Sequence, residues 1–481
     1  MTNENWETLP AKLEYSRDQP VQHVNYSRFV ARHTGHHLRY MENVGWYRWN
    51  GAVWEATGGT GAAFQAITDA AHVLNQYATD NPAAIAWITR AVQLMLNNQH
   101  RRAIVAEMEH LRNLRVTVDD FDSARHLLSF TNGTVDLRTG ELRDFNAADM
   151  LTQQARVNYT PDATAPRWLA WLDEVFPGDV DLQRYYQTWL GYCVTGEVRE
   201  HALGVWYGAH GRNGKGTTIR TMQAAFGEDI VREIPYETFE RTRNGVHTEV
   251  VAALRSVRMV VAQEGEQGVP MDVARLKNWS GGDRISTRHL HGKQFSFDPK
   301  FTLVLATNEL PEFSAGGAAL WARTRAILFG QSFAGREDRT LEPTIQGPEI
   351  EGVAAWIVEG AKRYYAEGLI DPVSVEMARK FHKAEVDPLK PLIGELFVYD
   401  ADSVIRTSAF NAELKHWRDV NGDQSAKYKP LSVKRELKRN SVDIVRRNGV
   451  DHYKGIRVLT SDGHPMSDRE GSSPGIFGHD N

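Results

Sequence analysis

Residues 209–217 combine three glycines and one lysine in a spacing that suits the phosphates of a nucleotide. The segment is Ala-His-Gly-Arg-Asn-Gly-Lys-Gly-Thr, and it lies between an apolar run, Leu203–Tyr207, and a helical pattern that starts near Thr218. Glycines let backbone N–H groups turn inward around phosphate oxygens, Lys215 supplies a positive charge, and the N-terminus of the following helix adds its dipole. The predicted nucleotide-binding residues are Gly211, Asn213, Gly214, Lys215, Gly216, Thr217 and Thr218.

This segment departs from the usual phosphate-binding loop at two positions. Ala209 stands at the first glycine position, although Gly208 precedes it, and Gly216 stands where a serine or threonine normally provides a hydroxyl group for Mg²⁺. Thr217 or Thr218 must then provide that hydroxyl group, and the sequence leaves the choice open. The alternative for the whole segment is a glycine-rich turn with a solvated lysine. The expected cofactors are ATP and Mg²⁺.

Two polar residues follow later apolar runs that predict strands. Glu264 comes soon after Met259–Ala262, where an acidic residue beside a phosphate-binding loop can hold metal-bound water and orient the attacking water. Asn308 comes soon after Phe301–Ala306, and an amide there can hydrogen-bond the γ-phosphate or the attacking water. The alternative for Glu264 is an ordinary surface acid. The predicted catalytic residues so far are Lys215, Glu264 and Asn308, and the predicted metal contacts are Thr217 and Glu264.

The order of these motifs resembles that of the superfamily 3 helicases of the phage and plasmid primase–helicase type, which are relatives of the poxvirus primase–helicase. The Lys-x-x-Ser-Gly-Gly-Asp element at 277–283 is the most specific part of the resemblance. The resemblance implies a modified AAA+ fold, a hexameric ring and 3′→5′ translocation on single-stranded DNA. The matching segments are Gly211–Thr217, Ala262–Glu264, Leu276–Ile285, Ala306–Pro311 and Ala319–Arg325, with Phe130–Leu137, Trp168–Phe176 and Trp189–Tyr192 upstream.

The resemblance also implies roles for four further residues. Arg323 matches the arginine finger that completes the nucleotide site of the neighbouring subunit, and Arg325 lies close enough to be confused with it. Residues 285–297 alternate like two strands, and the family places a DNA-contacting hairpin there, with His291 and Lys293 at its tip. Lys277 is assigned to DNA as well. The alternatives are a surface arginine and a solvated hairpin tip.

A basic segment near the carboxyl end predicts a second DNA-binding region. A helical stretch around Val433–Leu437 precedes two strand-like stretches that meet near Asn448-Gly449. This is typical of a winged helix, which pairs a helix for the groove with a basic wing for phosphates. The alternative is a winged helix that docks another protein. The predicted DNA contacts here are Lys434, Arg435, Lys438, Arg446 and Arg447.

These patterns predict an α/β fold with an AAA+ type P-loop ATPase domain, an N-terminal α+β domain and a C-terminal winged-helix domain. Short apolar strands that alternate with helices favour a parallel sheet in the ATPase domain. The predicted boundaries are 1–196 for the N-terminal domain, 197–345 for the ATPase, 346–384 for a helical connector, 385–460 for the winged helix and 461–481 for a disordered tail.

Composition sets wider limits. The chain has 481 residues, a formal net charge of −5 and one cysteine, Cys193, so an intrachain disulfide and a cysteine-based zinc site are excluded. A helicase needs only a local basic track, and the net charge is compatible with one. We see neither a signal peptide at the amino terminus nor an apolar run that could span a bilayer. The expected location is the cytoplasm of a bacterial host.

Two clusters invite other chemistry. Asp119-Asp120-Phe121-Asp122 could suggest a two-metal polymerase or primase site, but too little chain precedes it for a full primase palm, and we interpret it as a loop. His33, His36 and His37 could suggest a metal site, but we interpret them as a solvated cluster because cysteines and paired acids are not nearby.

The preferred hypothesis is a replicative or origin-unwinding DNA helicase of a bacteriophage or mobile element, acting as a homo-hexamer, with a separate primase as an open question. A second hypothesis is a DNA-binding initiator whose ATPase remodels a complex or loads another helicase. Processive strand displacement on a forked substrate separates the two. A third, a small-molecule P-loop kinase, is opposed by the Gly281-Gly282-Asp283 element and the basic carboxyl-terminal segment.

Overall fold

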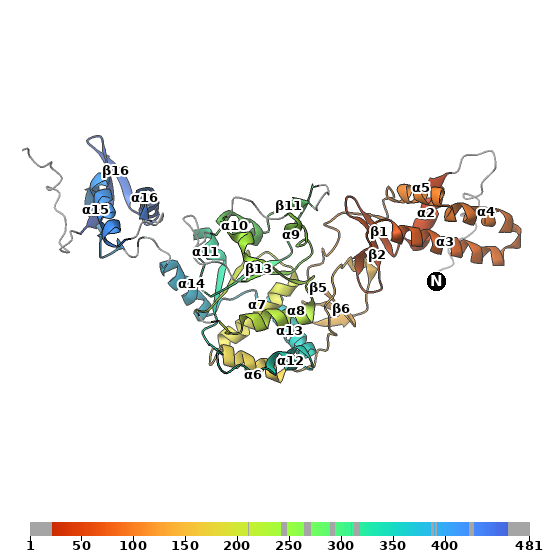
Figure 1. Cartoon of the computed structure of the whole chain (residues 1–481), viewed down its shortest axis with the longest axis horizontal. Helices are drawn as coiled ribbons and strands as arrows, with labels where there is room; N and C mark the ends of the chain where they lie inside the picture. The colour runs from red at the N-terminus through yellow and green to blue at the C-terminus, as the bar shows by residue number, and fades with distance from the viewer. Residues whose placement is uncertain are drawn as a thin grey trace, which may run out of the picture.

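A computed structural model describes residues 22–209, 211–241, 248–263, 271–288, 294–308, 310–311, 318–385, 389, 392–422 and 428–459. Figure 1 shows helices from the first hundred residues at one end, a mixed sheet-and-helix unit in the middle and a small carboxyl-terminal unit at the other end. Three residues singled out from the sequence, Glu264, His291 and Lys293, lie outside the described residues, as does the predicted tail 461–481.

The N-terminal part packs helices against a small sheet of order β3-β2-β1-β4. The Asn50-Gly51 turn lies between β2 and β3, which pair antiparallel, with Trp49 opposite Trp54. The helices α3 and α4 are separated at Pro82, because proline cannot continue the first helix. The elements are α2 (His23–Thr34), β1 (Leu38–Met41), β2 (Gly45–Trp49), β3 (Trp54–Ala56), α3 (Gly61–Asp80), η2 (Pro82–Ala84), α4 (Ile85–Leu96), α5 (Asn98–Met108) and β4 (Arg115–Val116).

A three-stranded meander and two helices lead into the central unit. The hairpin of β6 and β7 is joined by β5 in the order β5-β6-β7. Asp179 caps α7 because its carboxylate accepts a hydrogen bond from the Leu182 backbone N–H. The elements are β5 (Leu127–Phe130), β6 (Gly133–Asp136), β7 (Glu141–Arg143), η3 (Ala147–Asp149), α6 (Pro166–Val175) and α7 (Val180–Thr195).

Five parallel strands form the central sheet, in the order β14-β8-β13-β10-β9. The three predicted apolar runs are β8, β10 and β13, so the expectation of a parallel α/β sheet is confirmed, while β9 and β14 were not predicted. The elements are β8 (Leu203–Tyr207), α8 (Lys215–Phe226), β9 (Val231–Pro235), η4 (Tyr236–Phe239), α9 (Thr248–Ala252), β10 (Met259–Gln263), α10 (Val273–Gly281), β11 (Ile285–Arg288), β12 (Gln294–Phe297), β13 (Thr302–Thr307), α11 (Ala318–Arg323) and β14 (Thr324–Leu328).

Each face of this sheet is buried in its own hydrophobic core. Trp206 and Val261 belong to the core shared with α7, α8 and α13, whereas Val205 and Val260 belong to the core shared with α9, α10 and α11. Neighbouring strand residues point to opposite faces, so both faces must be covered. Figure 1 shows these two groups of helices on opposite sides of β13. The first core continues from Leu128 to Val194, so residues on both sides of position 196 pack together.

The remaining elements flank the sheet or form the carboxyl-terminal unit. The predicted strands around 285–297 pair as the antiparallel hairpin β11–β12, with Ile285 opposite Phe297 at its base. The carboxyl-terminal unit has its own core and an antiparallel sheet of order β15-β17-β16. The elements are α12 (Leu341–Gln346), α13 (Ile350–Glu367), α14 (Val373–Glu385), β15 (Phe397–Arg406), α15 (Thr407–Val420), α16 (Pro430–Arg439), β16 (Asp443–Arg447) and β17 (Val450–Val458).

Candidate functional site

A cavity of about 920 Å³ lies at the carboxyl edge of the parallel strands. The strand order explains its position, because β13 pairs directly with β8 and β10 pairs with β13. The segments that leave these three strands therefore meet at one edge, where open α/β sheets bind ligands. Six of the seven predicted nucleotide-binding residues and the predicted catalytic Asn308 line the cavity: Gly211, Asn213, Gly214, Lys215, Gly216 and Thr217.

The loop between β8 and α8 has the backbone that a phosphate-binding loop needs. Arg212 and Gly214 have φ angles of 58° and 100°, so the chain turns twice through the left-handed region before α8 begins at Lys215. A Cβ atom on Gly214 would lie 3.0 Å from the side chains of both Trp171 and Val175, which explains the glycine by close approach as well as by φ. The buried Asn213 amide donates to the Gly208 carbonyl oxygen at 3.3 Å and so closes the loop on itself.

Lys215 and Asn308 meet inside the cavity. The ammonium group of Lys215 donates to the Asn308 side-chain oxygen at 3.4 Å and to the Gly208 carbonyl oxygen at 3.5 Å. Lys215 is only 7% exposed, so its charge lies in a partly dry environment. A buried ammonium group is costly without an anion or polar oxygens around it. A ligand phosphate fits that requirement, and the loop glycines leave room for it.

The two threonines that the sequence could not separate lie in different surroundings. Thr217 lines the cavity, and its hydroxyl group donates to a Glu342 carboxylate oxygen at 3.0 Å. Thr218 is fully buried beneath the loop, where its hydroxyl group donates to the Gly214 carbonyl oxygen at 3.3 Å and accepts from the Tyr186 hydroxyl group at 3.0 Å. Of the two hydroxyl groups, that of Thr217 is the one at the cavity surface.

The opposite wall of the cavity was not predicted. It comes from α6 and from the segment that follows β14, and it is rich in paired charges. Glu342 accepts from Arg220 of α8 at 2.9 Å as well as from Thr217, and Arg212 forms an ion pair with Glu337. The sequence signal that could have drawn attention to it is the charge-dense run at 336–339. The cavity residues on this wall are Arg167, Trp171, Glu174, Phe333, Arg336, Glu337, Asp338, Arg339, Leu341, Glu342 and Pro343.

Hydrogen bonds favour the ionised form of two acids of this wall, Asp338 and Glu342. The pKa of Asp338 falls to about 2, chiefly because its carboxylate accepts from the Thr340 hydroxyl group and backbone N–H, and then because Arg167 donates to it. The pKa of Glu342 is lowered, first by its hydrogen bond with Arg220. Both groups therefore stay anionic at neutral pH and pair with arginines.

Two predicted catalytic residues, Glu264 and Arg323, are not among the described residues that line the cavity. Glu264 lies outside the described residues, while its neighbour Gln263, the last residue of β10, does line the cavity. Arg323 ends α11, and its guanidinium group donates to the Lys277 carbonyl oxygen at 2.8 Å. A Cβ atom on Gly281 would lie 2.9 Å from that guanidinium group, so the glycine of the Ser-Gly-Gly-Asp element makes room for Arg323.

Arg325 has a different environment from Arg323. Its side chain is 13% exposed and forms an ion pair with Asp371 at 2.9 Å, and Asp371 also pairs with Arg379 of α14 at 3.2 Å. The Tyr185 hydroxyl group donates to the same carboxylate at 3.1 Å. Arg325 thus fastens α14 to the edge strand β14, which distinguishes the two arginines that the sequence left confusable.

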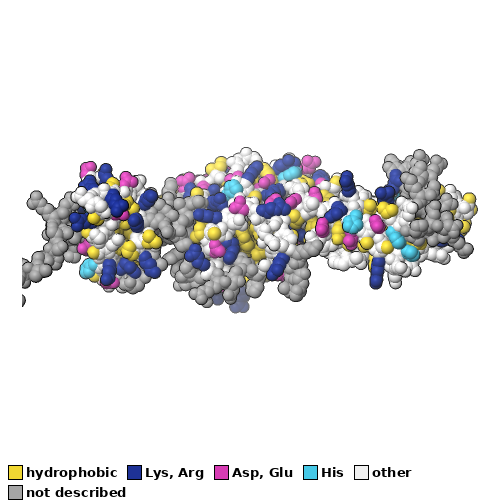
Figure 2. All heavy atoms as spheres, turned by 90° about the horizontal axis from the view of Figure 1, so that it is seen from above, with side chains coloured by type: hydrophobic (Ala, Val, Ile, Leu, Met, Phe, Trp, Pro, Cys, Tyr) yellow, Lys and Arg dark blue, Asp and Glu magenta, His cyan; other side chains and the backbone are white. Residues whose placement is uncertain are grey.

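The predicted DNA-contacting residues fall into two regions. Lys277 lies in α10, near the hairpin β11–β12 whose predicted contact residues His291 and Lys293 are outside the described residues. In α16, Val433 and Leu437 are buried, while Lys438 is exposed and Lys434 is half-buried. Arg446 and Arg447 are exposed on β16, and the side chain of Arg435 is outside the described set. Figure 2 shows Lys and Arg side chains spread over this unit, with Asp and Glu among them.

The three histidines near the amino terminus, His33, His36 and His37, each lie against another ring. His33 packs on Phe29 with ring centroids 4.5 Å apart, and the rings of His36 and His37 are 3.8 Å apart. In the part of the chain that the structure describes, no three His, Cys, Asp or Glu side chains are placed to hold a metal ion together. No helix there has the length and apolar character needed to cross a membrane.

Comparison with known proteins places this geometry in a family context. Residues 27–177 match the family described as "D5 N terminal like". Residues 27–177 are therefore similar to that family, and we call them the D5 N terminal like region. The chain is also 23% identical over 334 residues to "Putative helicase L207/L206" of Acanthamoeba polyphaga mimivirus, which covers 65% of this chain and 34% of the viral protein. It is 27% identical over 249 residues to "Putative helicase 184R" of Invertebrate iridescent virus 6, covering 49% and 25%.

The chain has a third kind of relative in "Putative primase C962R" of African swine fever virus, 20% identical over 401 residues that cover 77% of this chain and 41% of the viral protein. The resemblance to superfamily 3 primase–helicases, first drawn from the motifs, is thereby confirmed. The chain spans less than half the length of these viral proteins. A solved structure titled "The A form apo structure of NrS-1 C terminal region-CTR" is 10% identical, with a TM-score of 0.45, and covers 87% of this chain and 95% of that one.

Proposed function

We propose that this chain is an ATP-dependent DNA helicase that assembles as a hexameric ring and translocates 3′→5′ on single-stranded DNA. Its relatives carry names of helicases and primases of large DNA viruses, which supports a role in DNA replication. The bacteriophage or mobile-element source, the bacterial cytoplasm and a separate primase partner stay predictions.

The observation that carries the proposal is the meeting of Lys215, Thr217 and Asn308 in one cavity at the carboxyl edge of the sheet. Lys215 would bind the β- and γ-phosphates, Thr217 would hold Mg²⁺, and Asn308 would orient the γ-phosphate or the attacking water. Mg²⁺, when bound, would neutralise the negative charge that develops on the phosphates. We propose Glu264 as the residue that orients the attacking water, since it directly follows Gln263 at the cavity.

The strand order supports an AAA+ type of domain. One strand, β13, lies between the P-loop strand β8 and the strand β10 that leads to Glu264. Asn308 at the end of β13 is thereby placed between the two motifs. Arg323 lies away from the cavity of its own chain, as an arginine acting on a neighbouring subunit must. We therefore propose Arg323 as the arginine finger of the ring.

Two regions would hold DNA. The hairpin β11–β12, with Lys277, His291 and Lys293, would contact single-stranded DNA in the ring channel. The carboxyl-terminal unit, in which α16 precedes the β16–β17 hairpin, supports a winged-helix domain that would bind duplex DNA with Lys434, Arg435, Lys438, Arg446 and Arg447.

One experiment tests the proposed function as a whole. ATP hydrolysis is measured with and without single-stranded DNA, beside the oligomer mass, and unwinding is followed on a forked duplex. We expect DNA-stimulated hydrolysis, a hexamer and strand displacement. Stimulated hydrolysis without displacement would indicate the alternative, an initiator or helicase loader. A rate of ATP hydrolysis that does not change when DNA is added would exclude both the helicase and the initiator or helicase loader.

A combined variant tests the carboxyl-terminal unit. Replacing Lys434, Lys438, Arg446 and Arg447 by alanine removes up to four phosphate contacts, so the slope of log affinity against log salt for duplex DNA should fall by about 3. Basal ATP hydrolysis should not change, because the unit has its own core. An unchanged affinity and salt slope would mean that the unit docks a protein instead.

A further inference from the structure

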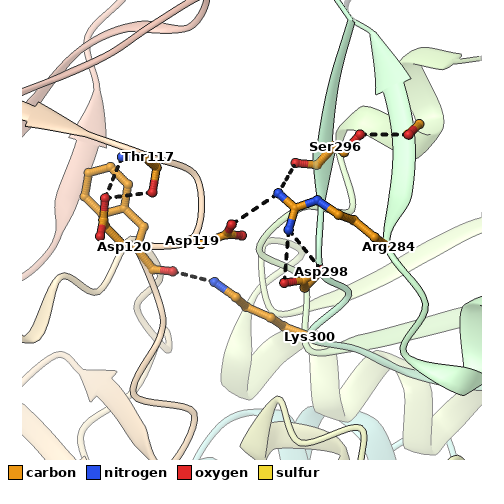
Figure 3. A network of polar contacts seen from close by, with 9 residues as sticks. Thr117, Asp119, Asp120, Arg284, Ser296, Asp298 and Lys300 are labelled. Atoms are coloured by element: carbon orange, nitrogen blue, oxygen red, sulfur yellow. Dashed lines mark hydrogen bonds and ion pairs between the residues drawn. The ribbon is translucent and has the colours of Figure 1, made fainter.

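The loop that follows β4 contacts the base of the β11–β12 hairpin. Figure 3 shows this contact, with the aspartates of the loop on one side and Arg284, Asp298 and Lys300 on the other. Arg284 directly precedes β11, and Asp298 directly follows β12, so both lie where the hairpin leaves the sheet unit. The loop belongs to the D5 N terminal like region. The contact therefore joins that region to the hairpin that we propose as the DNA-contacting element.

Arg284 is the centre of the contact. One terminal nitrogen, Nη1, donates to both carboxylate oxygens of Asp298 at 3.2 and 3.3 Å. The other, Nη2, donates to the Asp119 carboxylate at 3.2 Å and to the Ser296 carbonyl oxygen at 3.2 Å (Figure 3). A planar guanidinium group can hold several oxygens at fixed angles, whereas a lysine ammonium group cannot reproduce that fork. One side chain thus ties both hairpin strands to the loop.

A buried contact lies beneath this exposed one. Lys300, 9% exposed, donates to the Phe121 carbonyl oxygen. The neighbouring Asp122 is 2% exposed and accepts from the Thr152 backbone N–H at 2.8 Å and from the Thr152 hydroxyl group at 2.6 Å. Burial lowers the pKa of Lys300, and the negative charge of Asp122 opposes that shift. The loop is therefore anchored in the protein interior at the point where it meets the hairpin.

The three carboxylates of the 119–122 segment all have protein partners. Asp120 accepts from the Thr117 backbone N–H at 2.6 Å and from the Thr117 hydroxyl group at 2.7 Å, which closes the loop on itself. Asp119 pairs with Arg284, and Asp122 with Thr152. The segment that could suggest a two-metal site in the sequence therefore makes contacts within the protein instead. We call residues 117–122, together with Arg284 and Lys300, the clasp.

We propose that Arg284 is a positioning residue that fastens the DNA-contacting hairpin to the D5 N terminal like region through the clasp, so that this region sets the angle at which the hairpin enters the channel. The proposal rests on the proposed function of the hairpin. It makes the N-terminal region part of the coupling between ATP hydrolysis and DNA movement.

The ion pair between Arg284 and Asp119 is exposed, so we expect it to affect the position of the hairpin more than the global stability. Arg284 and Asp119 are 49% and 48% exposed, and exposed pairs contribute little to global stability. Loss of Arg284 should therefore leave the fold intact, while Asp122 and Lys300 keep the loop in place. The expected change is local, in the angle and mobility of the hairpin.

The test compares Arg284→Ala, Arg284→Lys and a matched control, Arg184→Ala. Arg184 of α7 pairs with Glu367 of α13 at 3.2 Å, with side chains 59% and 46% exposed, so it is a similarly exposed ion pair on elements other than the hairpin and the loop. Hydrogen exchange of β11, β12 and residues 117–122 is measured by mass spectrometry in the full chain. Basal and DNA-stimulated ATP hydrolysis are measured as a function of single-stranded DNA concentration, at several salt concentrations.

For both Arg284 variants we expect exchange in β11 and β12 to rise about threefold, which is the size of effect that an exposed ion pair can have, with no change in the control. The maximal DNA-stimulated rate should fall at least about threefold, while basal hydrolysis and the salt slope of DNA binding stay the same. A direct phosphate contact predicts otherwise: Arg284→Lys would behave as wild type, and Arg284→Ala would lower the salt slope by about 1. That result would overturn the proposal, as would unchanged exchange in β11 and β12.

The exchange measurement separates this proposal from the proposed function. If the wild-type chain hydrolyses ATP without responding to DNA, the proposed function fails, and the exchange result still shows whether Arg284 fastens the hairpin. If wild type responds to DNA and Arg284→Ala responds equally, the clasp does not position the hairpin. If the proposal is right, Asp119 and Arg284 act as one pair. The exchange rates of the double variant Asp119→Ala/Arg284→Ala should therefore match those of Arg284→Ala alone.

Discussion

The two walls of the cavity at the sheet edge are built differently. The wall from the sheet edge carries Lys215 and Asn308, which contact each other and the loop backbone. The other wall, which comes from α6 and the segment after β14, carries acids and arginines that pair with each other and with α8, such as Glu342 with Arg220. The first wall therefore offers groups to a ligand, and the second fixes the position of the first. The proposed ligand contacts and the ion pairs that support them therefore come from separate stretches of the chain.

The largest effect should come from a residue on neither wall. Arg323→Ala should bind ATP nearly normally but hydrolyse it about 10³–10⁵-fold more slowly, the range expected for an arginine supplied in trans. Mixing it with Lys215→Ala protein should restore part of the activity, since one ring can combine an intact lysine with an intact neighbouring arginine. Hydrolysis is measured against mixing ratio, with subunit exchange confirmed by mass. If the subunits exchange and no mixture exceeds the sum of the two variants, the walls of one subunit suffice.

The sheet wall is tested by Lys215→Ala. Removal of one preorganised donor to a developing negative charge typically costs about 10²–10³-fold in rate, so hydrolysis should fall by at least that factor. The protein should stay folded, because Lys215 lies at the N-terminus of α8 and not in a hydrophobic core. Circular dichroism and oligomer mass provide the check. Retained DNA-stimulated turnover would remove the nucleotide site from this cavity.

The second wall is tested by Glu342→Gln. The amide keeps the shape of the carboxylate but loses the charge that pairs with Arg220, so Thr217 should be held less firmly. Residues behind a metal ligand typically contribute 10–100-fold to metal affinity, and we expect the Mg²⁺ concentration for half-maximal hydrolysis to rise about tenfold. Glu174→Gln is the control, because Glu174 lines the cavity but pairs with Arg167. Equal Mg²⁺ curves for the two variants would show that the wall does not act through Thr217.

The smallest effect concerns pH. The folded-state pKa of Asp338, about 2, lies below the usual value near 4, so its contribution to stability is present above about pH 4 and is lost as the pH falls toward 2. Wild type should melt slightly higher than Asp338→Asn at pH 6, by about 2 °C or less, because the carboxylate is exposed. The difference should shrink between pH 4 and 2.5. A difference that stays constant over that range would show that the carboxylate charge plays no part.

The sheet wall could be predicted from the sequence, and the second wall could not. Glycines and a lysine at this spacing after a strand are typical of a phosphate-binding loop. The proposed roles of Lys215 and Thr217 can therefore be predicted from the local sequence. Glu342 and Arg220 are ordinary charged residues until the fold brings them together from 122 positions apart. Asn308 is intermediate: a polar residue at a strand end is common, and only the pairing of β13 with β8 brings it to the lysine.

The strands follow the same rule. The interior strands β8, β10 and β13 are continuous apolar runs, and those runs predicted them. The two edge strands were missed because each carries charges: Arg232 and Glu233 in β9, and Arg325 in β14. An edge strand has one neighbour and tolerates polar side chains, so its pattern is weaker. The alternating hairpin β11–β12 was predicted, but its clasp was not, since Asp119 and Arg284 meet only through tertiary structure.

The position of β8 in the sheet has a consequence for synthesis of the chain. Leu203 of β8 pairs with Leu303 on one side and with Thr324 on the other, so neither neighbour exists until a further hundred residues or more have been made. At a translation rate of about 5–20 residues per second, the apolar P-loop strand waits on the order of 5–20 s for a partner. During that interval its unpaired edges could join another nascent chain. The helices α6 and α7, which are made first and share its core, are the part of the protein available to shelter it.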